Sequence, residues 1–389
     1  MECLVVNIGS SSKKYALYRG QAQVFSCHFE HEEGMIGVTT VQGDTHTHEK
    51  KEVAVFDASA QYFLDAYRHA FGNVTITTIG VRIVAPGSYF QEHRIIDETY
   101  IAKLTEASSI APLHIKATLD ELHRLRQVFP GARCVAASDS AFHSTMPRVA
   151  QLYGLPRLVS NEYDIKRFGY HGLSVSSVIE SLRHHTGDVL PERIIVLHLG
   201  SGCSATALRK GQTIDTSMGF TPLEGLLMST RSGSFDPTII FSLLERGLTR
   251  EEIEMMLNTA SGLRGVSDTT SDMREIIERS NSGDRNAGEA LELFVYTIAK
   301  IVGAYTVALG GLDALVFTGT IGERSFIVRG KILDSLTFLI PSFNRDVNNQ
   351  EDGSVDHIAE VTSTQTGTRV YVVPTNESLS IIQAVKTFE

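Results

Sequence analysis

The sequence predicts a mixed α/β protein built from two related domains. Short β-rich runs bounded by turn residues alternate with helical segments along the whole chain. The run that begins at Val5 is echoed near the middle of the chain by the run that begins at Val196, which indicates a duplication. A length of 389 residues exceeds what one ordinary hydrophobic core requires and is sufficient for two domains.

The two echoed segments share a strand, a turn of small residues and a second strand that ends at glycine. They are residues 5–17 and 196–208, and they match at a constant offset of 191 residues. The identical pairs in this alignment are Val5 and Val196, Gly9 and Gly200, Ser10 and Ser201, Ala16 and Ala207, Leu17 and Leu208, and Gly20 and Gly211. A duplicated domain explains the repeat, and chance similarity between two glycine-containing hairpins is the alternative.

Further strands and helices follow from hydrophobic runs and the residues that bound them. Short β-rich runs predict strands over residues 76–84, 133–137, 193–199, 314–318 and 369–373. Thr249 and Glu252 form a capping-box pattern that predicts the start of a helix. A longer helix is expected over residues 286–309 and a final helix over residues 378–388. The last turns of the longer helix are apolar nearly all round, so we expect burial in its domain or at a subunit contact.

Composition narrows the classes of function. The formal net charge of −10 argues against general binding to nucleic acid or to anionic membranes, which requires a basic surface. Four scattered cysteines form no CxxC pair, and we expect them to be reduced and buried. The longest apolar stretch, residues 298–312, contains Lys300 and is shorter than the ~20 residues of a membrane span. We therefore expect a cytoplasmic protein without a signal peptide.

Two turns of small residues are candidate phosphate-binding sites. Residues 9–12 and Lys14 would present backbone N–H groups, hydroxyls and a positive charge to an anion. Residues 200–202 would form the matching turn of the second half. Serine-rich turns are common without a ligand, but two such turns, one from each domain, could bind a polyphosphate from opposite sides of a cleft. No GxxxxGK[ST] motif occurs in the chain, so this is not a P-loop site.

A third candidate segment combines glycine, hydroxyl residues and one arginine without helical or strand periodicity. It covers residues 215–226 and continues through residues 229–233, which include Arg231. Such a composition predicts an ordered loop, and ordered loops often carry function. The planar guanidinium of Arg231 suits phosphate or carboxylate oxygens.

These segments together resemble the acetate kinase family of the sugar kinase, Hsp70 and actin superfamily. The resemblance covers essentially the whole chain in order, and the Asp-Thr-Ser-Met-Gly and Thr-Arg-Ser-Gly blocks are its most specific motifs. The matching blocks include residues 7–12, 111–114, 139–147, 167–174, 215–225, 230–233, 310–313, 317–319 and 374–377.

The resemblance implies a duplicated actin-like ATPase fold, with a ribonuclease H-like domain in each half and a central cleft. The first domain would comprise residues 1–143 and 378–389. The second, residues 144–377, would hold the nucleotide site and the homodimer contact. The implied reaction is reversible phosphoryl transfer from ATP to acetate, giving acetyl phosphate and ADP, with Mg²⁺ or Mn²⁺. The expected partners are thus a small carboxylate and a nucleotide, with neither nucleic acid nor a membrane.

The resemblance also assigns catalytic and substrate-binding residues. Asp139 matches the catalytic acid or base, and His171 and Arg231 match the pair that stabilises the transition state. Arg82 matches the arginine that holds the substrate carboxylate, and Tyr170 stands where phenylalanine lines the acetate pocket. A carboxylate is a sufficient nucleophile without deprotonation, so catalysis would rest on positioning and charge neutralisation.

Metal-binding and donor-binding positions are implied in the same way. Asn7 and Glu377 match the magnesium-site positions, and Lys14 matches a phosphate-binding lysine. Together with Lys14, the implied donor-binding residues are Ser10, Ser12, His198, Leu199, Gly200, Ser201, Gly202, Asp272, Met273, Arg274, Thr320, Ile321, Gly322, Glu323 and Arg324.

Some positions depart from the family pattern. Ser201 stands where asparagine is usual, Thr320 replaces a glycine and Arg324 replaces an asparagine on the adenosine side. These departures leave open a longer acid such as propionate or butyrate, and pyrophosphate as the donor. From another class, a catalytically degenerate nucleotide-binding regulatory module is the alternative. Retention of the implied transition-state residues His171 and Arg231 argues against it, since a binding module does not need them.

Overall fold

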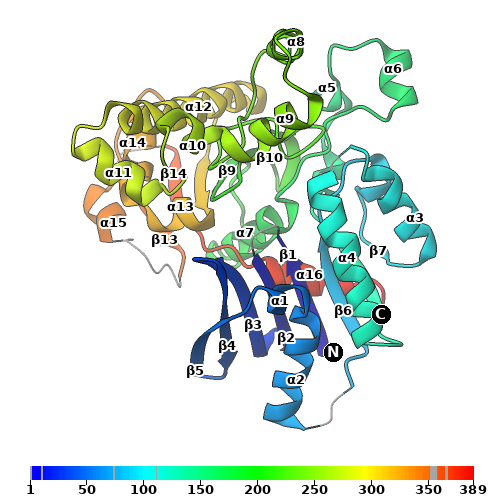
Figure 1. Ribbon diagram of the computed structural model, residues 1–389. Helices are drawn as coiled ribbons and strands as arrows, with labels where there is room; N and C mark the ends of the chain where they lie inside the picture. The colour runs from blue at the N-terminus through cyan, green and yellow to red at the C-terminus, as the bar shows by residue number, and fades with distance from the viewer. Residues whose placement is uncertain (1, 10–11, 73–74, 111, 351–356, 364–366) are drawn as a thin grey trace. The chain divides into compact units, whose positions relative to one another are not determined.

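The computed structural model describes residues 2–9, 12–72, 75–110, 112–350, 357–363 and 367–389, with only the backbone of residues 112–114. The chain forms two compact units. Unit 1 is Met1–Ala141 with Asn376–Glu389, and unit 2 is Phe142–Thr375. Each unit is built on one mixed β-sheet (Figure 1). Glu377, placed in the second domain by the sequence boundaries, belongs to unit 1 here.

The sheet of unit 1 has eight strands in the order β5-β4-β3-β2-β1-β6-β8-β7. The strands β1, β6 and β8 are parallel to one another, and the others pair antiparallel. Their bounds are β1 Glu2–Ile8, β2 Ser12–Arg19, β3 Ala22–Glu32, β4 Met35–Gln42, β5 Thr45–Lys51, β6 Thr78–Ile83, β7 Arg94–Ile95 and β8 Arg133–Ser138.

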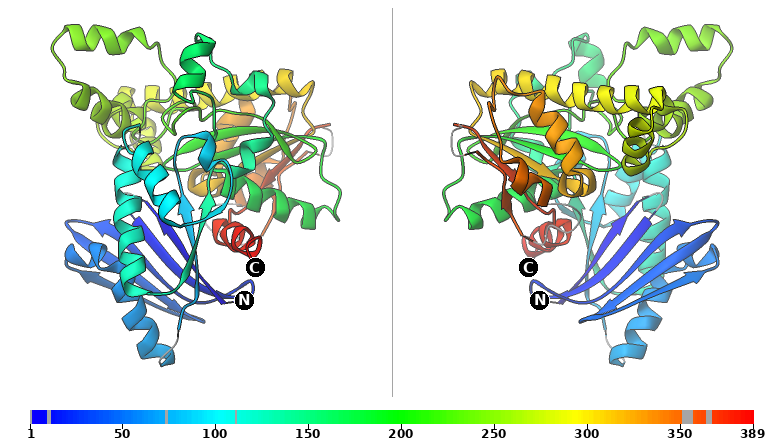
Figure 2. Two further views of the ribbon diagram at one scale, coloured as in Figure 1. Left: turned by 90° about the vertical axis from the view of Figure 1, so that its right-hand side faces the viewer. Right: turned by 90° about the vertical axis from the view of Figure 1, so that its left-hand side faces the viewer.

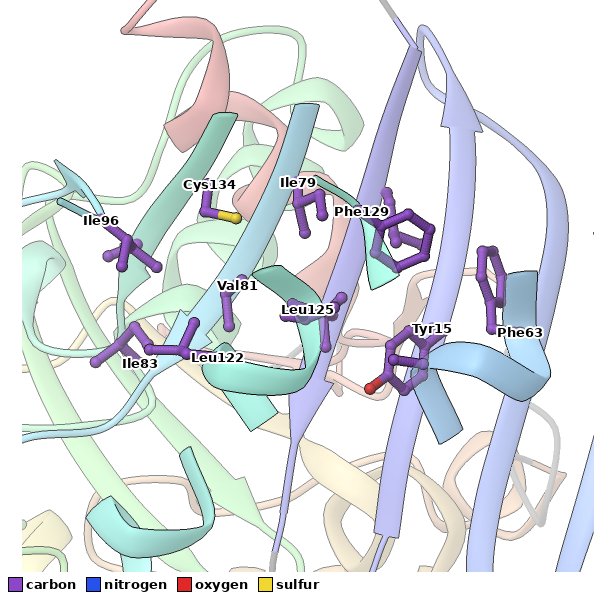
Figure 3. Close-up of a cluster of buried hydrophobic side chains, with 14 of the residues drawn as sticks. Tyr15, Phe63, Ile79, Val81, Ile83, Ile96, Leu122, Leu125, Phe129 and Cys134 are labelled. Carbon is purple, nitrogen blue, oxygen red and sulfur yellow. The ribbon is translucent and has the colours of Figure 1, made fainter. Parts of the chain in front are cut away.

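Helices cover both faces of this sheet. One face packs with α2 and α4 in an apolar cluster that includes Tyr15, Phe63, Val81 and Leu122 (Figure 3). The other face receives α16, which contacts β1, β6 and β8. The helices are α1 Ala54–Asp57, α2 Ser59–Phe71, α3 Glu98–Ala107, α4 Pro112–Val128 and α16 Glu377–Lys386, with a 3₁₀ turn at Ser88–Phe90. Alternate residues of β1 and β6 thus face α4 or α16, which explains why these strands are apolar on both sides.

The sheet of unit 2 has six strands in the order β11-β10-β9-β12-β14-β13. The bounds are β9 Arg193–Leu199, β10 Cys203–Arg209, β11 Gln212–Thr216, β12 Ala314–Thr318, β13 Ala359–Glu360 and β14 Arg369–Val372. Of the predicted strands, 193–199 and 314–318 are confirmed to the residue. The other three predictions are confirmed with shifts of one or two residues at their ends.

The helices of unit 2 also flank its sheet. Apolar residues of α7 pack with β9, β12 and β14 on one face, and α12 contacts β9, β10 and β11. Figure 1 and both views of Figure 2 show α8 standing away from the sheet. The bounds are α5 Arg148–Gln151, α6 Arg157–Glu162, α7 Gly172–His185, α8 Thr238–Glu245, α9 Arg250–Met255, α10 Gly262–Ser267, α11 Met273–Asn281, α12 Arg285–Leu309, α13 Gly319–Arg324, α14 Phe326–Asp334 and α15 Arg345–Gln350.

All three helix predictions can be compared with the structure. The final helix, predicted over residues 378–388, is α16 with shifts of one and two residues at its ends. The capping box of Thr249 and Glu252 is present at the start of α9. The predicted long helix is α12, whose length and composition would allow a membrane span, a property that core helices of soluble proteins share. Its end is only partly buried: Leu309 is 2% exposed, whereas Val307 is 82% exposed. Packing within unit 2 therefore does not cover the whole apolar surface of this helix.

The duplication predicted from the sequence is confirmed by the topology. The order and direction of β3-β2-β1-β6-β8 in unit 1 recur as β11-β10-β9-β12-β14 in unit 2. The hairpins differ by one residue, however, because Ile8 pairs with Lys13 in the first and Leu199 pairs with Cys203 in the second. The second turn is one residue shorter, so the offset of 191 aligns β1 with β9 but misaligns the following strands by one position.

Candidate active site

A network of polar side chains lies at the carboxyl ends of the parallel strands of unit 1. Asn7 is near the end of β1, Arg82 is near the end of β6, and Asp139 follows β8 directly. Glu377 is the first residue of α16 and joins them. Carboxyl ends of adjacent parallel strands meet at one edge of a sheet, where α/β proteins place ligands.

The guanidinium of Arg82 connects all four residues. Its Nη1 donates to Glu377 Oε2 at 3.0 Å and its Nη2 donates to Asp139 Oδ2 at 3.1 Å. Asn7 Nδ2 also donates to Glu377 Oε2 at 2.8 Å, and Arg82 Nη1 lies 3.4 Å from Asn7 Oδ1. The structure therefore brings together the predicted carboxylate-binding arginine, the predicted acid or base and both predicted metal-site residues.

The electrostatics of this network fix the arginine in its charged form. Burial alone would lower the pKa of Arg82, but the carboxylates of Asp139 and Glu377 outweigh that effect and raise it. The side chain of Asp139 is only 1% exposed, so this pair is shielded from water on its acidic side. Arg82 Nε is buried and has no hydrogen-bond partner among the described residues, which leaves one donor of the guanidinium unused.

The first predicted phosphate turn adjoins this network through the register of β1 and β2. Lys14 lies directly across from Asn7, so both side chains belong to the same face of the hairpin. The turn is closed by Gly9 N–H, which donates to the backbone oxygen of Ser12 at 2.8 Å. Ser10 lies outside the described residues, and its predicted role stays a prediction.

The donor atoms of this region suit a hard cation held by few protein groups. Asn7 and Glu377 offer an amide oxygen and a carboxylate, the ligand types that Mg²⁺ prefers while keeping several waters. No group of three or more His, Cys, Asp or Glu side chains that could hold a metal occurs in the described part of the chain. The residues thus fit a hydrated Mg²⁺ and do not form an all-protein metal cage.

In unit 2 two histidine rings pack against each other at a tilt beside the second predicted turn. His171 precedes α7 in the left-handed region, with φ of 59°, and its ring lies 4.1 Å from that of His198 between centroids. His171 Nδ1 is 3.0 Å from Ser204 Oγ, and His198 Nδ1 is 2.8 Å from Ser174 Oγ. These serine contacts fix the orientation of both rings and leave each Nε2 on the opposite side of its ring.

The predicted turn, histidine and arginine of unit 2 converge at Gly202. A Cβ at this position would lie 3.2 Å from His171 Nε2 and 3.6 Å from Arg231 Nη1, so the backbone of the turn contacts both side chains. The Thr-Arg-Ser-Gly loop is also tied to the turn, because Ser229 N–H donates to the backbone oxygen of Ser201 at 3.1 Å. The sequence blocks that carry His171, Ser201 and Arg231 therefore form one cluster.

Residues 215 and 216 of the predicted loop belong to β11, and the loop itself begins at residue 217. It is ordered by contacts that sequence reasoning missed. Arg167 Nη1 donates to the backbone oxygens of Thr216 and Ser217 at 3.1 and 3.2 Å, and its Nη2 donates to Glu224 Oε1 at 2.7 Å. Tyr153 OH donates to Glu224 Oε2. Arg167 and Glu224 lie inside the matching blocks, but their separation of 57 residues gave no signal of a pair.

The side chains of Arg231 and Tyr170 both contact this loop. Arg231 Nη1 donates to the backbone oxygen of Pro222 at 3.1 Å. Tyr170 OH donates to the backbone oxygen of Phe220 at 2.7 Å, and Tyr170 is 1% exposed. The hydroxyl that distinguishes Tyr170 from the family's phenylalanine thus bonds to the backbone of the loop.

The predicted adenosine-side segment, residues 320–324, lies in the short helix α13. Its start lies near the second turn, since a Cβ at Gly200 would be 3.8 Å from Thr320 N. Glu323 Oε1 accepts from the N–H groups of Gly319 and Thr375 at 2.8 and 3.0 Å, so this carboxylate holds the backbone. Gly322 is buried, Ile321 is half-buried, and Thr320 and Arg324 are exposed.

The remaining predicted nucleotide stretch begins α11. Asp272 is the N-cap of α11 and accepts from Arg274 N–H at 2.9 Å. Its carboxylate also pairs with the exposed guanidinium of Arg274, while Met273 is 5% exposed and packs inward. These contacts account for Asp272 and Met273 as structural residues, and a role of this stretch in nucleotide binding stays a prediction.

Comparisons with known proteins identify the family of the chain. The model of the acetokinase family matches residues 2–383. The acetate kinase of Halothermothrix orenii is 38% identical over 98% of both chains. The crystal structure of Porphyromonas gingivalis acetate kinase is similar with a TM-score of 0.86, at 32% identity over 99% of both chains. A propionate kinase from Francisella tularensis gives a TM-score of 0.88, at 33% identity over 99% of both chains.

The polar clusters of the two units, the duplicated sheet and the match over nearly the whole chain lead to one assignment. Members of the matched family are phosphotransferases that use a carboxyl group as acceptor. The chain belongs to the acetokinase family.

Proposed function

We propose that this chain is a Mg²⁺-dependent acetate kinase, which transfers the γ-phosphoryl group of ATP reversibly to acetate and releases acetyl phosphate and ADP. The observation that carries the proposal is the guanidinium of Arg82, held between Asp139 and Glu377. A guanidinium fixed in this way can bind a small carboxylate in a defined orientation, which is the main requirement for an acceptor that needs no deprotonation.

On the acceptor side, Arg82 would bind the acetate carboxylate, and Asp139 would act by orienting Arg82. The ion pair of 3.1 Å to a carboxylate that is 1% exposed supports this role for Asp139 over proton transfer, since the acceptor has no proton to remove. Tyr170 would contact the methyl side of the substrate, as the family resemblance implies. Because its hydroxyl is bonded to Phe220, the ring would present an apolar face.

On the donor side, His171 and Arg231 would stabilise the charge that develops on the transferring phosphoryl group. Their convergence on the backbone of Gly202 supports a joint role. Such groups act by electrostatic stabilisation already in place before the reaction, and an arginine in this role contributes roughly 10³–10⁵ in rate. Lys14, Ser10, Ser12 and residues 198–202 would bind the phosphates of the donor.

Asn7 and Glu377 would hold Mg²⁺, mostly through its water ligands. When bound, the ion would neutralise charge on the donor oxygens.

The adenosine part of ATP would bind at residues 272–274 and 319–324. Pyrophosphate is a second candidate donor, and the exposure of Thr320 favours it. A β-branched side chain that projects from α13 would hinder the binding of adenine and would not affect pyrophosphate.

We further infer that the enzyme is a cytoplasmic homodimer whose contact lies in unit 2. Large apolar side chains are exposed on several helices of this unit, among them Leu158 at 78%, Phe241 at 63%, Tyr296 at 60% and Val307 at 82%. Contiguous apolar surface on a protein often marks a contact with another chain, so these side chains are the candidates for the dimer contact. Sedimentation of the purified protein at several concentrations tests the dimer.

Hydroxamate trapping of the acyl phosphate tests the proposed reaction. Purified protein with Mg²⁺ is given acetate, propionate or butyrate, each with ATP or pyrophosphate. We expect the highest kcat/KM with acetate and ATP. Greater activity with a longer acid would make this a propionate or butyrate kinase, and greater activity with pyrophosphate would change the donor. Nucleotide binding without acyl phosphate under every condition would favour the regulatory module.

A further inference from the structure

A lysine and a glutamate are buried together inside the apolar cluster of unit 1. Lys13 is 3% exposed and Glu121 is 0% exposed. Lys13 belongs to β2 and Glu121 to α4, the strand and helix that also carry Tyr15 and Leu122 in this cluster (Figure 3). Neither residue contributes to the polar network around Arg82, so the proposed reaction does not account for them.

The carboxylate of Glu121 receives three donors. Lys13 Nζ donates to Oε2 at 2.5 Å, Arg124 Nη1 donates to Oε2 at 3.3 Å, and Tyr15 OH donates to Oε1. Lys13 Nζ also donates to the backbone oxygen of Phe56 at 2.7 Å and lies over its ring at 4.4 Å. Lys13 is therefore held from both α1 and α4, and Tyr15 is held by the same carboxylate.

Stability alone is a poor reason for such a pair. Removing two charges from water costs several kcal/mol each, and an apolar pair of similar volume is often equally stable or more stable. A buried ionic pair also fixes the relative position of the two elements that carry it, since its hydrogen bonds form only in one geometry. The position of the pair in the hairpin shows what that geometry controls.

The pair lies directly behind the proposed phosphate-binding residues. Lys13 pairs with Ile8 at the last register position before the turn of the hairpin. Side chains alternate along β2, so Lys13 and Tyr15 point to the helices while Lys14, between them, points to the other face beside Asn7. Fixing Lys13 and Tyr15 from behind fixes the backbone that presents Lys14.

We propose that Glu121 is a positioning residue for the phosphate-binding hairpin. Through Lys13 and Tyr15 it holds the start of β2 against α4, and it thereby sets the place of Lys14 and of the adjoining turn. The consequence for catalysis rests on the proposed function of Lys14, whereas the effect on the hairpin does not.

The test compares single and double replacements of the pair. Lys13→Met leaves the buried Glu121 with Arg124, at 3.3 Å, as its remaining positive partner, and Glu121→Leu removes the carboxylate that pairs with the buried Lys13. Each single replacement should therefore lower the melting temperature, and Glu121→Leu should lower it more. The double variant Lys13→Met/Glu121→Leu removes both charges and should recover most of that loss. Glu121→Gln keeps the volume and one acceptor oxygen, so it removes the charge with the smallest change in packing. Lys103→Met/Glu106→Leu, which removes an exposed pair on α3 of the same unit, is the matched control.

Two readouts separate positioning from stability. The first is amide hydrogen exchange, which in the double variant should be roughly tenfold faster at Gly9, Lys14 and Tyr15 than in the parent. The second is the KM for the phosphoryl donor, which should rise roughly tenfold while the KM for the acid changes little. Glu121→Gln should change both in the same direction by less, and the control should change neither.

Unchanged exchange at these amides in a folded double variant would overturn the proposal, whatever the activity. Faster exchange with an unchanged donor KM would also overturn it, because the pair would then stabilise the hairpin without serving the donor. If the parent forms no acyl phosphate, the proposed function fails, and the exchange rates still decide whether Glu121 fixes the hairpin.

Discussion

Replacing Arg82 with leucine tests the centre of the unit 1 network through both stability and activity. The change removes the donors that Asp139 and Glu377 accept at 3.1 and 3.0 Å. Asp139 is the more sensitive partner, because its side chain is 1% exposed whereas that of Glu377 is 15% exposed. Breaking a buried ion pair by removing one of its members destabilises a fold by about 3–5 kcal/mol.

The expected change in melting temperature follows from the size of the unit. Unit 1 consists of segments of 141 and 14 residues, and in a domain of that size 1 kcal/mol shifts the midpoint by about 2–4 °C. Arg82→Leu should therefore lower the unfolding temperature of unit 1 by roughly 6–20 °C. Adding Asp139→Asn removes the buried charge, so the double variant should recover at least half of this loss while remaining inactive.

Circular dichroism melts and the hydroxamate assay measure the two effects. In the folded fraction below the transition, Arg82→Leu should raise the KM for acetate and lower kcat/KM by at least roughly 10²-fold through lost orientation. The KM for ATP should change little. An Arg82→Leu protein as stable as the parent would refute the proposed cost of losing the ion pair with Asp139. A variant in which only the KM for ATP changes would refute the role of Arg82 toward the acid.

Three further changes test other parts of the structure. Arg231→Ala should reduce kcat by roughly 10³-fold with an unchanged melting temperature, and near-normal turnover would contradict its role. Thr320→Gly should lower the KM for ATP and leave that for pyrophosphate unchanged; equal effects on both donors would show that Thr320 does not face adenine. Burial raises the pKa of the Cys27 and Cys203 thiols to about 12, so only the unfolded chain ionises them as pH rises from about 9. The stability contributed by the protonated thiols should be lost between about pH 9 and pH 12, and urea titrations of the parent should show a larger fall than those of Cys27→Ala.

The elements predicted best are those whose burial in the structure matches the pattern of apolar and turn residues in their own sequence. The strands β9 and β12 are short apolar runs buried on both faces and bounded by turn residues, so periodicity and boundary residues agree. The capping box of α9 is likewise a local signal, because all of its hydrogen bonds lie within four residues. The residues of the two clusters were found through specific motifs, which carry information that hydrophobic pattern alone does not.

Elements that depend on distant partners were missed. The strand β5 is exposed at six of its seven positions and rich in histidine and lysine, so no alternation of apolar and polar residues marks it. Arg167 pairs with Glu224, which is 57 positions away in the sequence, and Lys13 pairs with Glu121, which is 108 positions away. The one-residue difference between the two hairpins was also hidden, since two coincident identities in the second strands and one glycine just after them suggested an unbroken offset.

The position of α16 has a consequence for the order in which the protein folds during synthesis. This helix packs so closely on β6 that a Cβ at Gly80 would lie 2.6 Å from Ile381 and 2.8 Å from Val385. Yet the ribosome makes it only after residues 142–375, which takes roughly 10–50 s at ordinary elongation rates. Unit 2 is one continuous segment and can complete its core during that time, whereas one face of the sheet of unit 1 stays bare. The half of the enzyme that is synthesised first is therefore finished last, and the nascent chain needs protection from aggregation over that interval.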